Sequence, residues 1–237
     1  MVAAKLSPDE ALKQIDLEDI QISESTIHRW ADCYSRMMSK YAAALRVDAG
    51  YRWHLDEIFF KILKEKRYLF TVMDGASRFI LSYEISACKG GFNPTGLFVA
   101  AASRTFRLPR ILVSDGLKDF IKPAKKIFYR NWGPRFVHIR EIHLQNLFNQ
   151  NNLYERLNGE FRDRLQCTRG LKSDNPYIIH LIIAYHNFFR KHEGLKNNMT
   201  PAEAIGIDIL PVPDSDLSTS CDRWITFIQN AAIHTAA

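Results

Sequence analysis

The sequence predicts an α/β protein: a mixed sheet flanked by helices and preceded by a small helical region. Apolar residues recur with a helical period of about 3.6 up to residue 46, and the period falls to 2 from Tyr51. Beyond the first three strand-like runs, helical and strand-like segments alternate. The predicted order of elements is β-β-β-α-β-α-β-α.

The first segment, residues 1–46, is expected to be helical. "SPDEALKQI" opens with a Ser-x-x-Glu capping box, and "ISESTIHRWADCYSRMMSKYAAAL" forms a second helix. "ISESTIHRW" is typical of the turn and recognition helix of a helix-turn-helix, here a shortened one, which would offer DNA the side chains of Ser25, Thr26, His28 and Arg29. Residues 1–24 hold six acids against two lysines, which suits phosphate poorly. The alternative is a helical hairpin that packs on the main domain or on another subunit.

Three aromatic and β-branched runs follow, "YRWHLDEIFFKIL", "RYLFTVMD" and "RFILSYEIS". The short connections "KEK" and "GAS" predict an antiparallel meander. A helix is then expected in "NPTGLFVAAASRTF", with Asn93 as its N-cap and Pro94 at its first position. "LPRILVSDG" contains a short continuous apolar run that ends at Asp-Gly, which favours a strand buried on both faces.

The second half is predicted to contain more helix. A basic, partly helical stretch runs to Tyr129, followed by a strand in "RFVHIR" and a helix in "NNLYERLNGEFRDRL". "PYIIHLIIAYHNFFRKH" is a strongly apolar helix, and Thr200 and Pro201 begin a short one. The tail containing "PVPDSD" is expected to be irregular. The sequence therefore divides into a helical region 1–46, a main domain 47–207 and a tail 208–237.

Composition limits the class of protein. A chain of 237 residues with 46% hydrophobic content can bury one substantial core. No run approaches the roughly 18 apolar residues of a membrane span, and the first residues lack the apolar core of a signal peptide, so we expect a cytoplasmic protein. The four cysteines are widely separated, which argues against structural zinc and against a disulfide framework.

The net charge of +6 is unevenly distributed. Residues 118–140 carry seven basic side chains against one acid, and further arginines follow in 156–172. Clustered cations favour a polyanion, because binding releases counterions from the phosphate backbone. A solubility patch or an acidic protein partner is the alternative. The candidate DNA contacts in these two regions are Lys118, Lys122, Lys125, Lys126, Arg156, Arg162 and Lys172.

Three carboxylates occupy unusual positions. On the helix of residues 151–165, Glu155 heads the polar face, whereas Glu160 falls towards the apolar side. Asp56 lies in the middle of the first strand between residues expected to be buried, and Asp115 ends the fourth strand at the carboxyl edge of the sheet. If those two strands are neighbours, the two aspartates lie close together, and divalent cations would relieve their repulsion.

Six phrases occur in one order: "HLDEIFF" with "YLFTVMDGASRFI", "PRILVSDG", "NNLYERLNGEFRDR", "YHNFFRKHEGL" and "TPAEAIGI". Together they resemble the catalytic domain of DDE-type insertion-sequence transposases, relatives of retroviral integrases, over roughly residues 50–207. The resemblance implies a ribonuclease H-like fold for the main domain and an acidic triad of Asp56, Asp115 and Glu155. The 39 residues between Asp115 and Glu155 make this spacing somewhat longer than usual for the family.

The resemblance also implies an activity. Three carboxylates would hold two Mg²⁺ ions, with Mn²⁺ as a substitute, in the arrangement that phosphodiester cleavage requires. The expected reaction is cleavage at element ends followed by joining of 3′-hydroxyls to target DNA, performed by a homodimer or higher assembly on double-stranded DNA. Two alternatives stay open: a nuclease of the same fold that cuts without joining, and a DNA-binding regulator or inactive remnant.

Other polar residues receive simpler interpretations. Glu57 points to the opposite strand face from Asp56 and is expected at the surface or in support of the site. Asp74 is assigned to turn chemistry. Asn187, Arg190 and His192, in "YHNFFRKH", are expected to pack at a helix end or to contact DNA.

Overall fold

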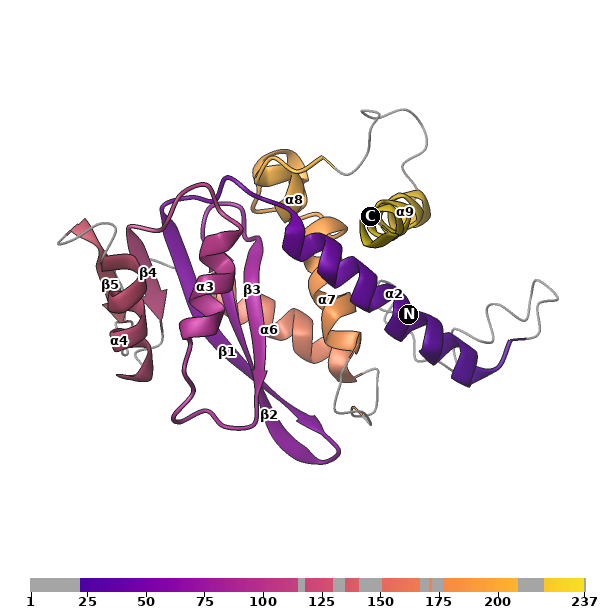
Figure 1. Cartoon of the computed structure of the whole chain (residues 1–237), viewed down its shortest axis with the longest axis horizontal. Coiled ribbons are helices and arrows are strands. Elements are labelled where there is room, and N and C mark those ends of the chain that lie inside the picture. Colours follow the sequence, from indigo (N-terminus) through magenta and orange to yellow (C-terminus); the bar gives the residue numbers. More distant parts are fainter. Residues whose placement is uncertain are drawn as a thin grey trace.

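The computed structural model describes residues 22–114, 118–129, 135–140, 151–166, 171, 177–208 and 220–236. A five-stranded mixed sheet lies at its centre, with the strand order β3-β2-β1-β4-β5 (Figure 1). β1 (Arg52–Ile62), β2 (Glu65–Asp74) and β3 (Ile80–Ser86) form an antiparallel meander, and β4 (Ile111–Ser114) and β5 (Val137–Arg140) run parallel to β1. The predicted α/β class and order of elements are confirmed.

Tight turns fix the register of the meander. β1 and β2 are joined by Leu63 and Lys64 alone, both with positive φ (50° and 70°), the backbone sign that suits a two-residue hairpin to the twist of its strands. At the end of β2, Asp74 is 1% exposed and accepts hydrogen bonds from Ser77 N and Oγ (2.8 and 2.6 Å) and from Gly50 N (2.9 Å). The turn role predicted for Asp74 is confirmed.

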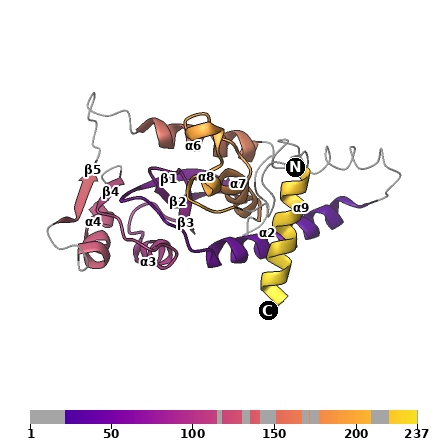
Figure 2. The ribbon, with the colours of Figure 1, turned by 90° about the horizontal axis from the view of Figure 1, so that it is seen from above.

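Helices cover both faces of the sheet. α3 (Thr95–Ser103) packs against β2 and β3, and α6 (Asn151–Gln166) lies over β1 on the opposite face (Figure 2). Asn93 Oδ1 accepts hydrogen bonds from Thr95 N and Oγ1 (3.1 and 2.6 Å), but Pro94 is the N-cap and the helix begins at Thr95, so the predicted start is one residue too early. Aromatic side chains fill the α3 side of the core, where Phe70 stacks on Phe92 at 3.9 Å.

The helix after β5 is followed by another, α7 (Tyr177–Phe188), that is buried along most of its length. Its Asn187 is 2% exposed; the side chain accepts from Ile80 N (2.8 Å) and donates to Ile80 O (3.0 Å). This pairing satisfies both backbone groups of Ile80 beside the register shift between β2 and β3. Asn187 therefore has the packing role that was one of the two expected for it.

Two short helical segments follow the predictions. α8 (Pro201–Ala204) has Thr200 as N-cap, with a capping box completed by Glu203. The basic stretch before β5 is helical from Lys118 to Tyr129, in a 3₁₀ turn (Lys118–Phe120), α4 (Ile121–Ala124) and a π turn (Lys125–Tyr129).

α2 (Glu24–Ala44) packs against α7 and against α9 (Ser220–Ala236). Its N-cap Ser23 accepts from Thr26 N, and His28 Nδ1 lies 2.5 Å from the Tyr177 hydroxyl. At the other end, half-buried Arg104 donates to Ala42 O and to Leu81 O, tying α2 to β3. This helix thus packs on the main domain, and the rest of the helical hairpin that the alternative expects is untested. The predicted helix in "SPDEALKQI" lies outside the described residues.

The expectation of an irregular tail is wrong for residues 220–236, which form α9 (Figure 2). Trp224 stacks on Phe189 at 3.8 Å, and Phe227 is fully buried against Phe188 and Phe189. Trp224, Phe227, Ile228 and Ala231 recur at helical spacing, so the pattern was present in the sequence. No helix in the described part of the chain is long and apolar enough to cross a membrane.

Candidate active site

The first wall of the candidate site is the pair β1 and β4. These strands are parallel neighbours, and their Cα register pairs Leu55 with Ser114. Asp56 follows Leu55 directly, and Asp115 follows Ser114 directly. The first and fourth strands are therefore neighbours, which is the condition for Asp56 and Asp115 to lie close together, whereas Asp115 itself lies outside the described residues.

The second wall is α6, which contacts β1. Asp56 is half-buried; its Oδ1 accepts from Glu57 N at 2.9 Å, and its Oδ2 lies 3.4 Å from Asn158 Nδ2. Asn158 is on α6, one helical turn after Glu155. Glu155 belongs to α6 as predicted, and its side chain lies outside the described residues.

Asn158 is a site residue that the sequence interpretation did not single out. Its Oδ1 is buried and has no hydrogen-bond partner among the described residues. A buried amide oxygen without a partner is costly, so this atom is suited to accept from a group that the protein chain does not supply, such as water on a cation. The available signal was its position three residues after Glu155 on the polar face of the helix.

The donor chemistry fits a hard cation. The predicted ligands are carboxylate oxygens, the type that Mg²⁺ prefers, and the orphaned Asn158 oxygen adds another hard acceptor beside Asp56. Within the described part of the chain no three His, Cys, Asp or Glu residues gather in a metal-binding arrangement. Asp115 and the Glu155 side chain, two of the three predicted ligands, lie outside it.

Glu57 occupies the other face of β1. Its side chain is only 10% exposed and forms an ion pair with Lys89, so of the two roles expected for it, at the surface or in support of the site, the surface position is not the one observed. The ion pair explains why a carboxylate is tolerated there, because a buried charge requires a partner. Glu57 also supports the site directly, since its backbone N–H donates to Asp56 Oδ1.

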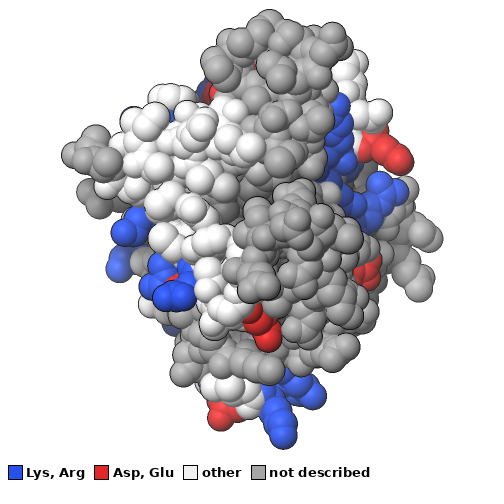
Figure 3. All heavy atoms as spheres, turned by 90° about the vertical axis from the view of Figure 1, so that its right-hand side faces the viewer, with Lys and Arg blue, Asp and Glu red and all other residues white. Residues whose placement is uncertain are grey.

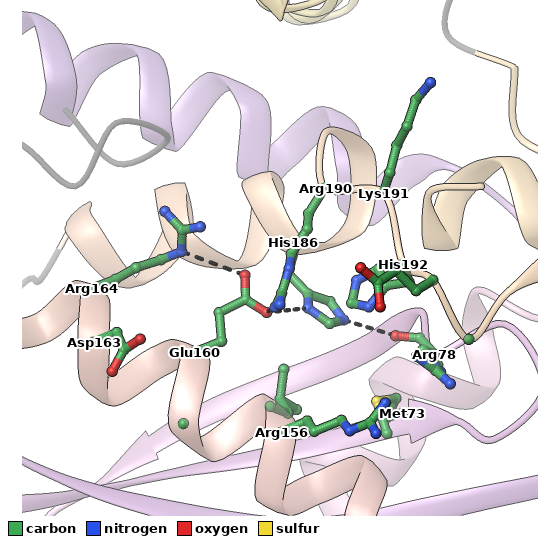
Figure 4. Close-up of a pocket in the computed structure, with 14 residues that line it drawn as sticks. Met73, Arg78, Arg156, Glu160, Asp163, Arg164, His186, Arg190, Lys191 and His192 are labelled. Carbon is green, nitrogen blue, oxygen red and sulfur yellow. Dashed lines mark hydrogen bonds and ion pairs between the residues drawn. The ribbon is translucent and has the colours of Figure 1, made fainter. Parts of the chain in front are cut away.

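A cavity of about 460 Å³ opens on another side of α6. Buried Glu160 lies at its centre, with a side chain 4% exposed (Figure 4). Its carboxylate contacts Arg164 Nε at 3.4 Å, His186 Nδ1 at 3.2 Å and Arg190 Nη1. Two guanidinium groups thus compensate one buried carboxylate, which joins α6 to α7 and the segment after it.

Burial lowers the pKa of both histidines that line this cavity. Burial lowers the pKa of His186 to about 4. The hydrogen bond from its Nε2 to the Arg78 carbonyl (3.0 Å) raises the pKa, but by less than burial lowers it. Burial, together with the nearby His186, Arg190 and Arg78, lowers the pKa of His192 to about 3. His192 packs edge-on against His186, with ring centroids 4.9 Å apart. His192 and Arg190 therefore belong to packing at the end of α7, one of the roles expected for them.

Comparison with known families identifies the chain. A family model described as a DDE domain matches residues 50–200. The chain belongs to the DDE-type insertion-sequence transposases. Membership supports polynucleotidyl transfer as the general class of activity, and the transposase has the ribonuclease H-like mixed α/β fold that the resemblance implied.

Solved structures resemble the transposase at low sequence identity. The HTLV-2 integrase catalytic core domain in complex with magnesium shares 16% identity with a TM-score of 0.47, covering 68% of this chain and 99% of that chain. The BIV integrase catalytic core domain shares 16% identity with a TM-score of 0.49, covering 65% and 93%. A chain in the structure of the simian T-cell lymphotropic virus intasome in complex with PP2A regulatory subunit B56 gamma shares 13% identity with a TM-score of 0.48, covering 74% of this chain and 61% of that chain. Comparison with curated sequences finds no match.

The predicted DNA contacts of the transposase lie on several elements. Lys118, Lys122, Lys125 and Lys126 are exposed along the helical stretch before β5, and Arg156 and Arg162 are exposed on α6. Ser25 and Arg29 are exposed on α2, Thr26 and His28 are half-buried, and Lys172 lies outside the described residues. The face in Figure 3 shows its described basic side chains in separate groups rather than one continuous patch. Charge alone therefore marks no single DNA path on that face.

Proposed function

We propose that this transposase cleaves phosphodiester bonds at the ends of its element and joins the resulting 3′-hydroxyls to target DNA, with Asp56, Asp115 and Glu155 as its acidic triad. The observation that carries the proposal is the contact between Asp56 on β1 and Asn158 on α6, one turn after Glu155. The in-register pairing of Leu55 with Ser114 supports it, because Asp56 and Asp115 are the next residues along neighbouring parallel strands.

The three carboxylates would hold two Mg²⁺ ions, and Mn²⁺ is expected to substitute for them. Such ions, when bound, activate an attacking hydroxyl and stabilise the departing 3′ oxygen. The residues of the chain orient this site. Glu57 N fixes Asp56 Oδ1 at 2.9 Å, and Asn158 Nδ2 approaches Oδ2 at 3.4 Å, so the Asp56 carboxylate is held between the strand and the helix.

The proposed partner is double-stranded DNA, both element ends and target. The exposed cations Lys118, Lys122, Lys125 and Lys126, which follow Asp115 in the sequence, and Arg156 and Arg162 on α6 would contact its phosphates. Joining two ends requires more than one active site, so we expect a homodimer or a higher assembly on DNA, acting on the DNA of the cytoplasm.

The test is strand transfer by the purified full chain on duplex DNA carrying the element's own ends, with Mg²⁺. We expect Asp56→Asn, Asp115→Asn and Glu155→Gln each to abolish joining while duplex binding and thermal unfolding stay near those of the wild type. Asp119→Asn is the matched control, since Asp119 is an exposed acid nearby in the sequence whose carboxylate accepts from Gly91 N. This control should join ends at the wild-type rate.

Supplying an end that is already cut to expose its 3′-hydroxyl separates the alternatives. Joined product identifies a transposase, and cleavage without joining identifies a nuclease of the same fold. Normal strand transfer by Asp56→Asn would refute the proposed triad, and a wild-type chain that binds DNA without cutting or joining would identify a regulator or inactive remnant.

A further inference from the structure

The basic residues around the Glu160 cavity fall into two groups. Arg164 and Arg190 are paired with Glu160, and Arg164 also lies over the Tyr185 ring at 3.9 Å. These two cations are explained by the structure itself, because they neutralise a buried carboxylate and link α6 with α7. Removing either would leave a charge uncompensated.

Arg78 and Arg156 form the second group. Arg78 lies in the turn between β2 and β3, Arg156 lies on α6, and both guanidinium groups line the cavity (Figure 4). Neither forms an ion pair with any acid in the described part of the chain. The guanidinium groups are close enough to repel one another. The pKa of Arg78 is lowered mainly by burial and also by the charge of Arg156. The pKa of Arg190 is lowered mainly by burial and also by the charge of Arg78. Converging cations without acids cost energy, and a bound anion would relieve it.

Arg78 is held in position rather than extended into solvent. Its backbone has a left-handed φ of 64°, which a residue with a side chain rarely adopts, and its carbonyl accepts from His186 Nε2 at 3.0 Å. Its guanidinium lies over Gly194, where a Cβ would overlap it. The absence of a side chain at Gly194 therefore makes room for the charged group. A pre-positioned guanidinium loses little freedom on binding an anion.

The position of the cavity on α6 relates it to the proposed triad. Arg156 and Gly159 line the cavity, whereas Asn158 contacts Asp56. On a helical wheel, Glu155 falls between Asn158 on one side and Gly159 and Arg156 on the other. The cavity and the proposed catalytic site therefore lie against adjacent faces of α6.

We propose that Arg78 and Arg156, with Arg190 beside them, bind a phosphate group of the DNA backbone next to the bond that reacts. This inference rests on the proposed function, since it takes DNA as the substrate. Planar guanidinium groups match the oxygens of a phosphate with paired hydrogen bonds. Eight residues of the cavity are charged, five of them basic and three acidic, so its charge also favours an anion. Arg190 stays paired with Glu160 and adds only its proximity to the guanidinium groups of Arg78 and Arg156.

The test measures binding of a fluorescent DNA duplex to the full chain without divalent metal, across a range of salt concentrations. Each phosphate contact contributes about 0.9 to the slope of log affinity against log salt. We expect Arg78→Gln to reduce affinity about tenfold and the slope by about 1. Arg156→Gln should do the same, and Arg78→Lys should keep the wild-type slope because it keeps the charge.

Arg46→Gln is the matched control. Arg46 is exposed, has no acidic partner in the described part of the chain, and lies over the Phe106 ring at 4.7 Å, away from the cavity. Its replacement should leave affinity and slope at wild-type values. Thermal unfolding by circular dichroism verifies that each variant is folded; if Arg78→Gln is not, Arg156→Gln decides, because exposed Arg156 takes no part in the turn.

The outcomes for the two proposals are separable. Wild-type slopes for both glutamine variants would overturn the phosphate site. The same result is expected if an acidic protein, rather than DNA, binds this cavity. Neither outcome would affect the proposal of strand transfer. Joining by Asp56→Asn would instead refute the proposed chemistry, whatever the salt slopes show. A reduced slope for both glutamine variants, with no change in Arg46→Gln, supports the phosphate site.

Discussion

At the scale of single residues, Asn158 is the side chain that connects α6 with Asp56. Its amide NH₂ approaches Asp56 Oδ2 at 3.4 Å, and its buried Oδ1 has no partner among the described residues. Asn158→Ala should therefore misorient the Asp56 carboxylate and remove an acceptor for a water molecule of the site. Because residues that orient metal ligands typically contribute 10–100-fold, we expect strand transfer to slow by about that factor.

This prediction is checked by the rate of joining on an end that carries a free 3′-hydroxyl, measured over a range of Mg²⁺ concentrations. A positioning role predicts that higher Mg²⁺ partly restores the rate, whereas a purely structural role predicts no such recovery. Gln229→Ala on the exposed side of α9 is the control and should join normally. A wild-type rate for Asn158→Ala would show that its contact with Asp56 is incidental.

Glu160 shows how far single residues could be predicted. The helical wheel places it towards the apolar side of its helix, and the side chain is indeed buried. Its partners could not be foreseen, because His186 and Arg190 follow 26 and 30 residues later on another helix and in the segment after it. Local periodicity determines on which face of the helix a residue lies. Only tertiary packing determines which side chains it contacts there.

At the scale of elements, the strands were predictable because their signals are local. Alternation and short turns predict the meander, and the continuous apolar run "ILVS" predicts a central strand, which β4 is, between β1 and β5. α9 was missed because "PVPDSD" made the whole tail look irregular, and because its apolar face has meaning only against α2 and the end of α7. The candidate site depends on the adjacency of β1 and β4, which the local strand signals left open because tertiary packing decides which strands pair.

The packing of α9 leads to a prediction about stability. Phe227 is fully buried and its ring contacts those of Tyr41, Phe188 and Phe189. Replacing a buried phenylalanine with alanine typically costs about 3–5 kcal/mol, through lost burial and the cavity left behind. We expect Phe227→Ala to lower the free energy of unfolding in urea by about that amount.

Ile233→Ala on the same helix is the comparison, since Ile233 is 72% exposed and should change stability by less than about 0.5 kcal/mol. Equal, small effects of both substitutions would mean that α9 is not packed against α2 and α7 in solution. A large effect of Phe227→Ala alone would establish α9 as part of the folded core.

At the scale of the whole molecule, two buried histidines make stability depend on pH. His186 on α7 has a pKa of about 4 and His192, after it, a pKa of about 3, both below the unfolded value of about 6.5. The charged groups facing them are Glu160 and Arg164 from α6, Arg190, and Arg78 from the turn between β2 and β3. Three of these four groups are cations, which oppose protonation of either imidazole.

The sign follows from proton uptake. Between about pH 6.5 and about pH 4 the unfolded chain binds protons on these histidines and the folded chain does not, so acidification favours unfolding. The shift of fully buried His186 corresponds to roughly 3 kcal/mol lost across that range, and His192, which is 9% exposed, adds to the loss. Urea unfolding at about pH 7 and about pH 5 should show this decline in the free energy of unfolding.

His192→Gln should reduce the difference in the free energy of unfolding between the two pH values, whereas replacement of exposed His234 by glutamine should leave that difference unchanged. An equal pH dependence in wild type and His192→Gln would mean that His192 is not buried in a neutral form, and the basic cavity would then be more open to solvent than its geometry indicates.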